Sequence, residues 1–290
     1  MKSRDLIELL VLAALWGGSF LFMRIAAPVL GPVWLIEIRV LLAGLVLLPL
    51  LARLGLLGEL RSRWKTLVVV GALNSAIPFS LLAYASVALP TGFTSILNAT
   101  APLFGMIVAA IWLKEPLTKV RLTGLVLGFL GVVVLVGRQP LGAVPLPAVV
   151  AGLGGGLMYA IAAPYIRQNL AGVPSLVVTT GSQLGAALVL APLLPFTLPR
   201  QQPTAAVTLA VLALAVLSTS LAYILYFRLI NHIGSTRALT VTYLVPVFAI
   251  LWGALVLREA VTLPMVAGCA LVLLGTAIAN GVISRARAAS

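Results

Sequence analysis

Long apolar stretches alternate with short polar or turn-forming segments along the whole chain. Each stretch is apolar on every face, whereas the strands of a membrane barrel would alternate apolar and polar residues in shorter segments. A helix of about 20 residues spans the hydrocarbon core of a bilayer and satisfies its own backbone there. The pattern predicts an all-α membrane protein with helices at residues 6–26, 33–52, 66–87, 92–113, 120–137, 147–167, 175–195, 206–228, 237–257 and 263–283.

Composition supports the bilayer as solvent. Hydrophobic residues make up 62% of the chain and charged residues 9%, and the mean hydropathy is +1.18. These charges are too few to cover a soluble protein of this length. The net charge of +13 does not indicate a nucleic-acid partner, because the basic residues lie in short caps between apolar stretches. The first stretch has no small-residue cleavage site, so we expect a retained span.

The basic residues also predict the orientation. With the N-terminus inside, 14 of the 19 Lys and Arg residues fall on cytoplasmic segments. These are Lys2, Arg4, Arg53, Arg61, Arg63, Lys65, Lys114, Lys119, Arg121, Arg167, Arg228, Arg237, Arg285 and Arg287, against Arg24, Arg39, Arg138, Arg200 and Arg258 elsewhere. We therefore expect a multi-pass protein with both termini in the cytoplasm.

The two halves of the chain resemble each other at a spacing of 144 residues. Pro102 matches Pro246, the segment 113–115 matches 257–259, and Gly124 and Gly131 match Gly268 and Gly275. The predicted units are residues 1–140 and 141–290, with five helices each. An odd number of helices places the second unit upside down relative to the first, which is a build typical of secondary transporters.

Several motifs resemble a known family. These are "ALWGGSF" at 14–20, "LKEPLT" at 113–118 and "LREAVT" at 257–262. With the five-plus-five layout, they resemble the drug/metabolite transporter superfamily, in its branch with two EamA-type repeats, and the YddG-type amino-acid exporters of bacterial inner membranes. The resemblance implies ten helices around a central cavity that opens alternately to each side. The family also exports other metabolites, nucleosides and drugs, so it does not fix the substrate.

Acidic residues are scarce, and Glu37 is the one acid that the sequence places inside a span away from its edges. Arg24 and Arg39 are expected at a similar depth. The three can form an ion pair or network, or they can act as an outer gate or bind the charged ends of a zwitterion. The first and sixth spans hold no deep acid to pair with a cation, which favours a neutral or zwitterionic substrate. Glu115 and Glu259 are interpreted as helix-ending residues with local ion pairs, or as hinges, and His232 as a loop residue.

Polar and aromatic residues in the middle of spans are the candidates for the lining of a cavity. They are Trp16, Ser19, Phe20, Asn74, Ser75, Phe79, Ser95, Asn98, Tyr159, Ser182, Gln183, Tyr223 and Tyr243. The competing interpretation of each is a hydrogen bond between helices. Pro78, Pro102 and Pro246 fall within spans, where a proline can kink the helix for gating or for structure alone.

The leading hypothesis is a secondary transporter that exports small zwitterionic metabolites, amino acids including aromatic ones, without ATP, cofactor or metal. The alternative is an exporter of another metabolite or drug. A membrane enzyme acting on lipids is disfavoured, because the sequence offers no cluster of Asp, Glu or His. The expected partners are the small-molecule substrate and the lipid bilayer, and we predict a monomer.

Overall fold

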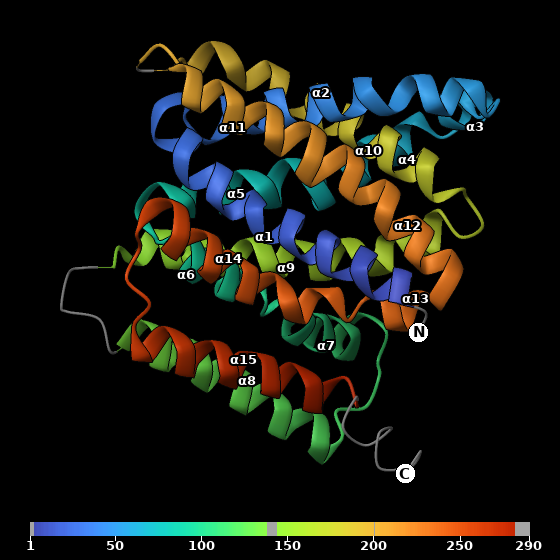
Figure 1. Cartoon of the computed structure of the whole chain (residues 1–290). Helices are drawn as coiled ribbons and strands as arrows, with labels where there is room; N and C mark the ends of the chain where they lie inside the picture. Colours follow the sequence, from blue (N-terminus) through green and yellow to red (C-terminus); the bar gives the residue numbers. More distant parts are fainter. Residues whose placement is uncertain (1–2, 138–143, 200, 282–290) are drawn as a thin grey trace.

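The computed structural model describes residues 3–137, 144–199 and 201–281, and all regular secondary structure within them is helical (Figure 1). Eight helical stretches are long and apolar enough to cross a membrane, and two shorter apolar helices, Val241–Leu257 and Leu263–Ala279, complete the bundle. The predicted all-helical membrane class is therefore confirmed. Lys2, Arg138, Arg200, Arg285, Arg287 and the predicted boundary between residues 140 and 141 lie outside the described residues.

Five of the spans are single helices or nearly so. They are α1 (Ser3–Leu30), α2 (Pro32–Arg53), α8 (Lys119–Gly137), α9 (Leu146–Asn169) and α10 (Ser175–Leu190), the last continued by a short 3-10 turn, η2 (Ala191–Phe196). A short helix, α3 (Leu57–Ser62), lies between the second and third spans. Each of these five spans coincides with a predicted helix.

The third and eighth spans each contain a π-helical turn. The third runs through α4 (Trp64–Gly71), η1 (Ala72–Ala76) and α5 (Ile77–Ala88). The eighth runs through α11 (Ala205–Ala215), η3 (Val216–Leu221) and α12 (Ala222–Ile233). The two π segments begin at residues 72 and 216, so they share the 144-residue spacing of the sequence motifs. Such turns are rare and often lie at functional sites.

The helices predicted at 92–113 and 237–257, the fourth and ninth in the predicted order, are interrupted. The fourth consists of α6 (Thr91–Asn98) and α7 (Ala101–Trp112), and the ninth of α13 (Ser235–Ala238) and α14 (Val241–Leu257). Pro102 is the second residue of α7 and Pro78 the second residue of α5, whereas Pro246 lies inside α14. Pro102 thus stands where a helix restarts after a break, which suits a residue without a backbone N–H, and Pro78 directly follows the π turn.

Helices α8 and α15 (Leu263–Ala279) pack along a seam of glycines. A Cβ on Gly124 would lie 2.6 Å from the Gly275 carbonyl oxygen, and a Cβ on Gly131 would lie 2.8 Å from that of Gly268. Only glycine permits backbones to approach this closely. Because α8 and α15 belong to different halves of the chain, these glycines form a contact between the two halves.

The bundle has two ends, which we name after the turns that follow α7 and α14. Lys114 and Arg258 end these helices in the left-handed conformation, with φ of 54° and 55°. The N–H of Glu115 then donates to the Ala109 carbonyl at 3.2 Å, and that of Glu259 to the Gly253 carbonyl at 3.1 Å. The Glu115 end and the Glu259 end lie on opposite sides of the molecule. Both ends of the described chain lie at the Glu115 end, on the right in Figure 1.

Candidate functional site

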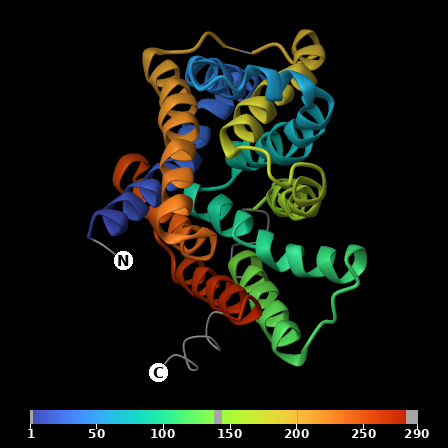
Figure 2. The same ribbon diagram turned by 90° about the vertical axis from the view of Figure 1, so that its right-hand side faces the viewer.

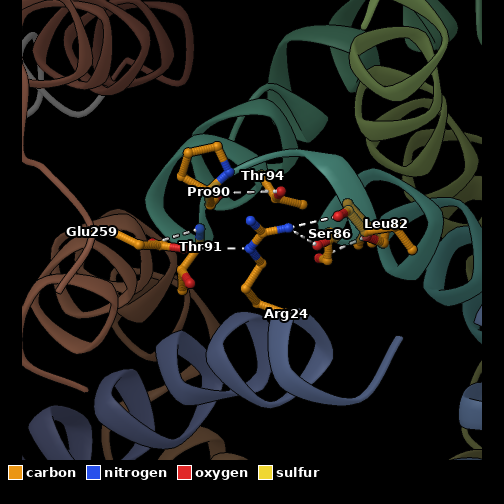
Figure 3. A network of polar contacts seen from close by, with 8 residues as sticks. Arg24, Leu82, Ser86, Pro90, Thr91, Thr94 and Glu259 are labelled. Carbon is orange, nitrogen blue, oxygen red and sulfur yellow. Dashed lines mark hydrogen bonds and ion pairs between the residues drawn. The ribbon is translucent and has the colours of Figure 1, made fainter. Parts of the chain in front are cut away.

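Arg24 and Glu259 join four helices at the Glu259 end (Figure 3). Arg24 Nη1, on α1, donates to the carbonyls of Ser86 at 3.1 Å and Val87 at 2.6 Å, where α5 ends. Its Nε lies 3.5 Å from Glu259 Oε1, and Glu259 Oε2 accepts from the Thr91 N–H at 2.9 Å, where α6 begins. A cation at a helix C-terminus and an anion at a helix N-terminus are both favourable placements. The network therefore connects α1, the end of α5, the start of α6 and the turn after α14 at this end.

The matching turn at the Glu115 end has only a local partner. Glu115 Oε2 pairs with Arg121 Nη1 at 3.1 Å, six residues further along the chain. The side chain of Glu115 is 42% exposed, whereas that of Glu259 is 17% exposed. The helix packing differs in the same sense: α6 packs against α1 and α14, whereas within the described residues α13 packs chiefly against α12. The turn at the Glu115 end, which faces the viewer in Figure 2, thus has fewer tertiary partners than the turn at the Glu259 end.

The structure does not bring Arg24, Glu37 and Arg39 together into the network considered from the sequence. Arg24 pairs with Glu259, and Arg39 Nε donates to Thr219 Oγ1 at 3.0 Å. Glu37 Oε2 is buried and has no hydrogen-bond partner among the described residues. Equal depth in the membrane did not predict contact, because residues 37 and 39 point to different sides of α2.

Arg39 is the centre of an aromatic cluster. It is 4% exposed, and its guanidinium carbon lies 3.7 Å from the centroid of the Phe79 ring. Tyr159 and Tyr223 lie near it. Phe79 contacts Tyr159 edge-on with ring centroids 6.3 Å apart, and Trp16 lies 6.3 Å from Tyr223. Five of the predicted site residues, from α1, α2, α5, α9 and α12, therefore gather here.

A second polar contact mirrors the bond of Arg39. Gln183 Nε2, on α10, donates to Ser75 Oγ in η1 at 3.1 Å. Gln183 stands 144 positions after Arg39, and Thr219 in η3 stands 144 positions after Ser75. The same bond between a straight helix and a π turn thus occurs once in each half of the chain, with a cation in the first half and a neutral amide in the second.

The remaining predicted lining residues are dispersed. The hydroxyls of Ser19 and Ser182 donate to the backbone of their own helices, and Phe20 is 3% exposed within the apolar core. Tyr243 lies on α14, away from the aromatic cluster, and its hydroxyl accepts a hydrogen bond from Asn280 Nδ2 at 3.1 Å. Asn74 and Asn98 are half-buried, and Asn98 Oδ1 and Ser95 Oγ have no hydrogen-bond partner among the described residues.

Two pockets are described, and both lie away from the aromatic cluster. A pocket of about 610 Å³ at the Glu115 end is lined by Pro102, Glu115 and Arg121 among others. A pocket of about 490 Å³ between α2, α5 and α10 is almost wholly apolar and includes Gly31 and Tyr84. Of the residues predicted to line the cavity or to act in gating, Pro102 alone lines one of these two pockets.

The charges near the start of α1 pair with α12. Glu8 Oε1 accepts from Arg4 at 3.1 Å and lies 3.3 Å from Arg228 Nη1. His232 Nδ1 lies 3.7 Å from Asp5 Oδ1. The interpretation of His232 as a loop residue was wrong, because α12 continues for five residues beyond the predicted end at 228. Within the described residues no group of three His, Cys, Asp or Glu could hold a metal ion.

Sequence reasoning missed Thr219, which receives the bond from Arg39, and Tyr226, whose ring centroid lies 5.1 Å from that of Trp16. The 144-residue spacing could have identified Thr219, because its counterpart Ser75 was selected. Tyr226 lies one turn after Tyr223, and this helical spacing was also a usable signal.

The chain resembles several known proteins over nearly its full length. It is 25% identical to the uncharacterized transporter YvbV of Bacillus subtilis (strain 168), covering 96% of this chain and 92% of that protein. It is 26% identical to an uncharacterized transporter of Archaeoglobus fulgidus, with coverage of 93% and 96%. Protein PecM of Dickeya dadantii is 27% identical, with coverage of 84% and 81%.

A crystal structure of a protein with 23% identity superposes with a TM-score of 0.68, covering 98% of this chain and 99% of that one, which shows a shared fold. The profile of the EamA-like transporter family matches twice, at residues 6–137 and 146–281. The two matches together span most of the chain, one in each half. The chain is a multi-pass membrane protein and belongs to the EamA-like transporter family.

Proposed function

We propose that this protein is a secondary transporter that exports small zwitterionic metabolites, amino acids including aromatic ones, by alternating access through a central cavity. The observation that carries the proposal is the unequal state of two matching turns. Glu259 links distant helices through Arg24 and Thr91, whereas Glu115 pairs with its local neighbour Arg121. A transporter of this kind closes its two ends in turn around a fixed site.

The arrangement of equivalent residues supports two inverted units of five spans. Gly124 contacts Gly275 and Gly131 contacts Gly268, so each glycine meets the counterpart of the other. This cross-pairing is the signature of a contact related by a two-fold axis. The matching bonds Arg39–Thr219 and Gln183–Ser75 obey the same relationship. An odd number of spans in each unit places the Glu115 and Glu259 turns at opposite faces of the membrane.

The inverted relationship also indicates what the other state looks like. The counterpart of Arg24 is Arg167, at a spacing of 143 residues, and Arg167 lies exposed at the end of α9. In the state closed at the Glu115 end, Glu115 leaves Arg121 and pairs with Arg167. The basic residues around Glu115 favour the cytoplasmic side for this end, so within this proposal the structure represents an inward-open state with both termini cytoplasmic.

The test is flux through the purified protein in liposomes. Vesicles that contain the protein and are loaded with labelled amino acids should release them faster than protein-free vesicles. Glu259→Gln should slow this release while the protein still inserts into the membrane. A parallel panel of nucleosides, other metabolites and drugs covers the wider family. Release of a panel compound but of no amino acid would transfer the proposal to that substrate class, and no flux of any compound would overturn transport itself.

A further inference from the structure

Arg39 is a buried cation without an anion. It lies seven residues into α2, about 10 Å from the start of the helix, and it is 4% exposed. Its guanidinium carries five N–H donors, yet within the described residues only Nε has an acceptor, the neutral hydroxyl of Thr219. No carboxylate lies within ion-pair distance of it in the described chain. A charge at this depth is costly and is retained for a function.

The structural part of this interaction needs no charge. Gln183 makes the equivalent bond to Ser75 in the other half of the chain through a neutral amide. The fold therefore obtains the same link between a helix and a π turn from a glutamine. What Arg39 adds is the positive charge and the planar pair of Nη groups, which match a carboxylate in a two-pronged hydrogen bond.

The surroundings of Arg39 define the rest of the ligand. Phe79 lies beneath the guanidinium and contacts Tyr159 edge-on, while Trp16 contacts Tyr223. Trp16, Tyr159 and Tyr223 are only half-buried, so part of each ring is available to a ligand. Aromatic rings with one charged group suit a compound with an apolar or aromatic body and one anionic end.

Within the described residues, no acidic side chain lies beside Arg39 to pair with the ammonium group of an amino acid. Glu37 is two residues from Arg39, about 200° around α2, and within the described chain the other acids lie near helix ends or in turns: Asp5, Glu8, Glu59, Glu115 and Glu259. We therefore propose that Arg39 binds the carboxylate of the substrate and that the ammonium is dispensable. The substrate class becomes monocarboxylates with an apolar or aromatic body, of which amino acids are one group; this specificity rests on the transport function proposed above.

The experiment measures binding to the purified full chain in lipid nanodiscs. Labelled L-phenylalanine and labelled 3-phenylpropionate are the probes, and L-phenylalaninamide and phenethylamine are the competitors that lack the carboxylate. Both acids should bind, and the amide and amine should compete about 30-fold more weakly, which is the cost of losing a charged hydrogen bond. Arg39→Gln should weaken the acids by a similar factor and leave the amide unaffected. Arg39→Lys should be intermediate, because the charge stays and the planar fork is lost.

Controls separate binding from folding. Arg39→Gln copies the residue found at position 183, so its thermal midpoint should match that of the wild-type protein. Arg228→Gln removes the arginine that pairs with Glu8 near the start of α1 and should leave binding unchanged. Competition by the amide equal to that of the acids, unchanged binding in Arg39→Gln, or no binding of either acid would each overturn the inference. Binding of the acids without flux in liposomes would overturn the transport function alone. Equal flux of the acids and of the analogues without a carboxylate would overturn the assignment of Arg39 alone.

Discussion

Lys114 and Arg258 stand 144 positions apart and adopt the same left-handed backbone conformation, with φ of 54° and 55°. Each ends a helix and directs the next residue, a glutamate, back to a carbonyl six residues before it. The left-handed conformation is unfavourable for residues with a Cβ. The two turns therefore have matching backbones and different partners for their glutamates, which makes them a matched pair for experiment.

The first prediction concerns the backbone of these turns. Lys114→Gly should raise the free energy of unfolding by about 1 kcal/mol and the thermal midpoint by about 2 °C, because glycine adopts this conformation without strain. Lys114→Val should lower the midpoint. Thermal unfolding in detergent measures both, with Lys119→Gly, at the start of a helix, as the control that should gain nothing.

The second prediction concerns the closed end. Glu259→Gln weakens the ion pair with Arg24, so the population open at the Glu259 end should rise about tenfold. Tyr84 and Val261 are both exposed at this end. Spin labels on cysteines introduced at these two positions report the opening as a longer distance between them. Cys269→Ala removes the one cysteine of the chain, so that only these positions are labelled. Glu115→Gln, which loses only a half-exposed local pair, should leave the distance unchanged. An unaltered distance in Glu259→Gln would show that the pair does not hold the end closed.

The third prediction disturbs the same end without removing a charge. A Cβ on Gly253 would collide with the carboxylate of Glu259 and lie 3.1 Å from Thr91 Cβ. Gly253→Ala should therefore lengthen the same spin-label distance. Gly105→Ala is the matched control, because a Cβ on Gly105 meets nothing within 4 Å.

The fourth prediction concerns the glycine seam. Gly124→Ala would place a Cβ 2.6 Å from the Gly275 carbonyl, so α8 and α15 would have to separate. The expected loss is about 2 kcal/mol of unfolding free energy, seen as a lower thermal midpoint. Gly137→Ala in the same helix meets open space and should leave the midpoint unchanged. Equal midpoints for both variants would contradict the close packing.

The fifth prediction distinguishes substrate contact from helix–helix bonding at Asn98. Its side-chain oxygen has no partner among the described residues, so Asn98→Ala should reduce flux while the thermal midpoint changes little. Ser75→Ala is the comparison, because Ser75 is fully buried and accepts the bond from Gln183. That variant should lower the midpoint. Unchanged flux in Asn98→Ala would assign Asn98 a structural role.

The span positions could be predicted from the sequence because membrane helices require long apolar stretches. The glycine contacts were predictable for a similar reason, since close packing requires small residues at helical spacing. The partner of Arg24 was not predictable by depth alone. Glu259 lies 235 positions away, and depth does not specify the direction in which a side chain leaves its helix.

The breaks within the spans also escaped the sequence reading. No residue type marks a π turn, so the third and eighth spans were expected as continuous α-helices. The aromatic residues Trp16, Phe79, Tyr159 and Tyr223 were selected correctly as a group, but their common centre at Arg39 depends on how five helices are rotated. That rotation is set by packing between distant segments.

The π turns determine how the aromatic cluster responds to a one-residue deletion. The extra residue in η1 rotates everything after it by about 100° relative to an uninterrupted α-helix. Phe79, three residues beyond the turn, lies beneath Arg39 only because of this phase shift. A single-codon deletion within Ala72–Ala76 would leave every chemical group of the aromatic cluster in the protein and still dismantle it, so reading-frame-preserving deletions here are as damaging as loss of the arginine.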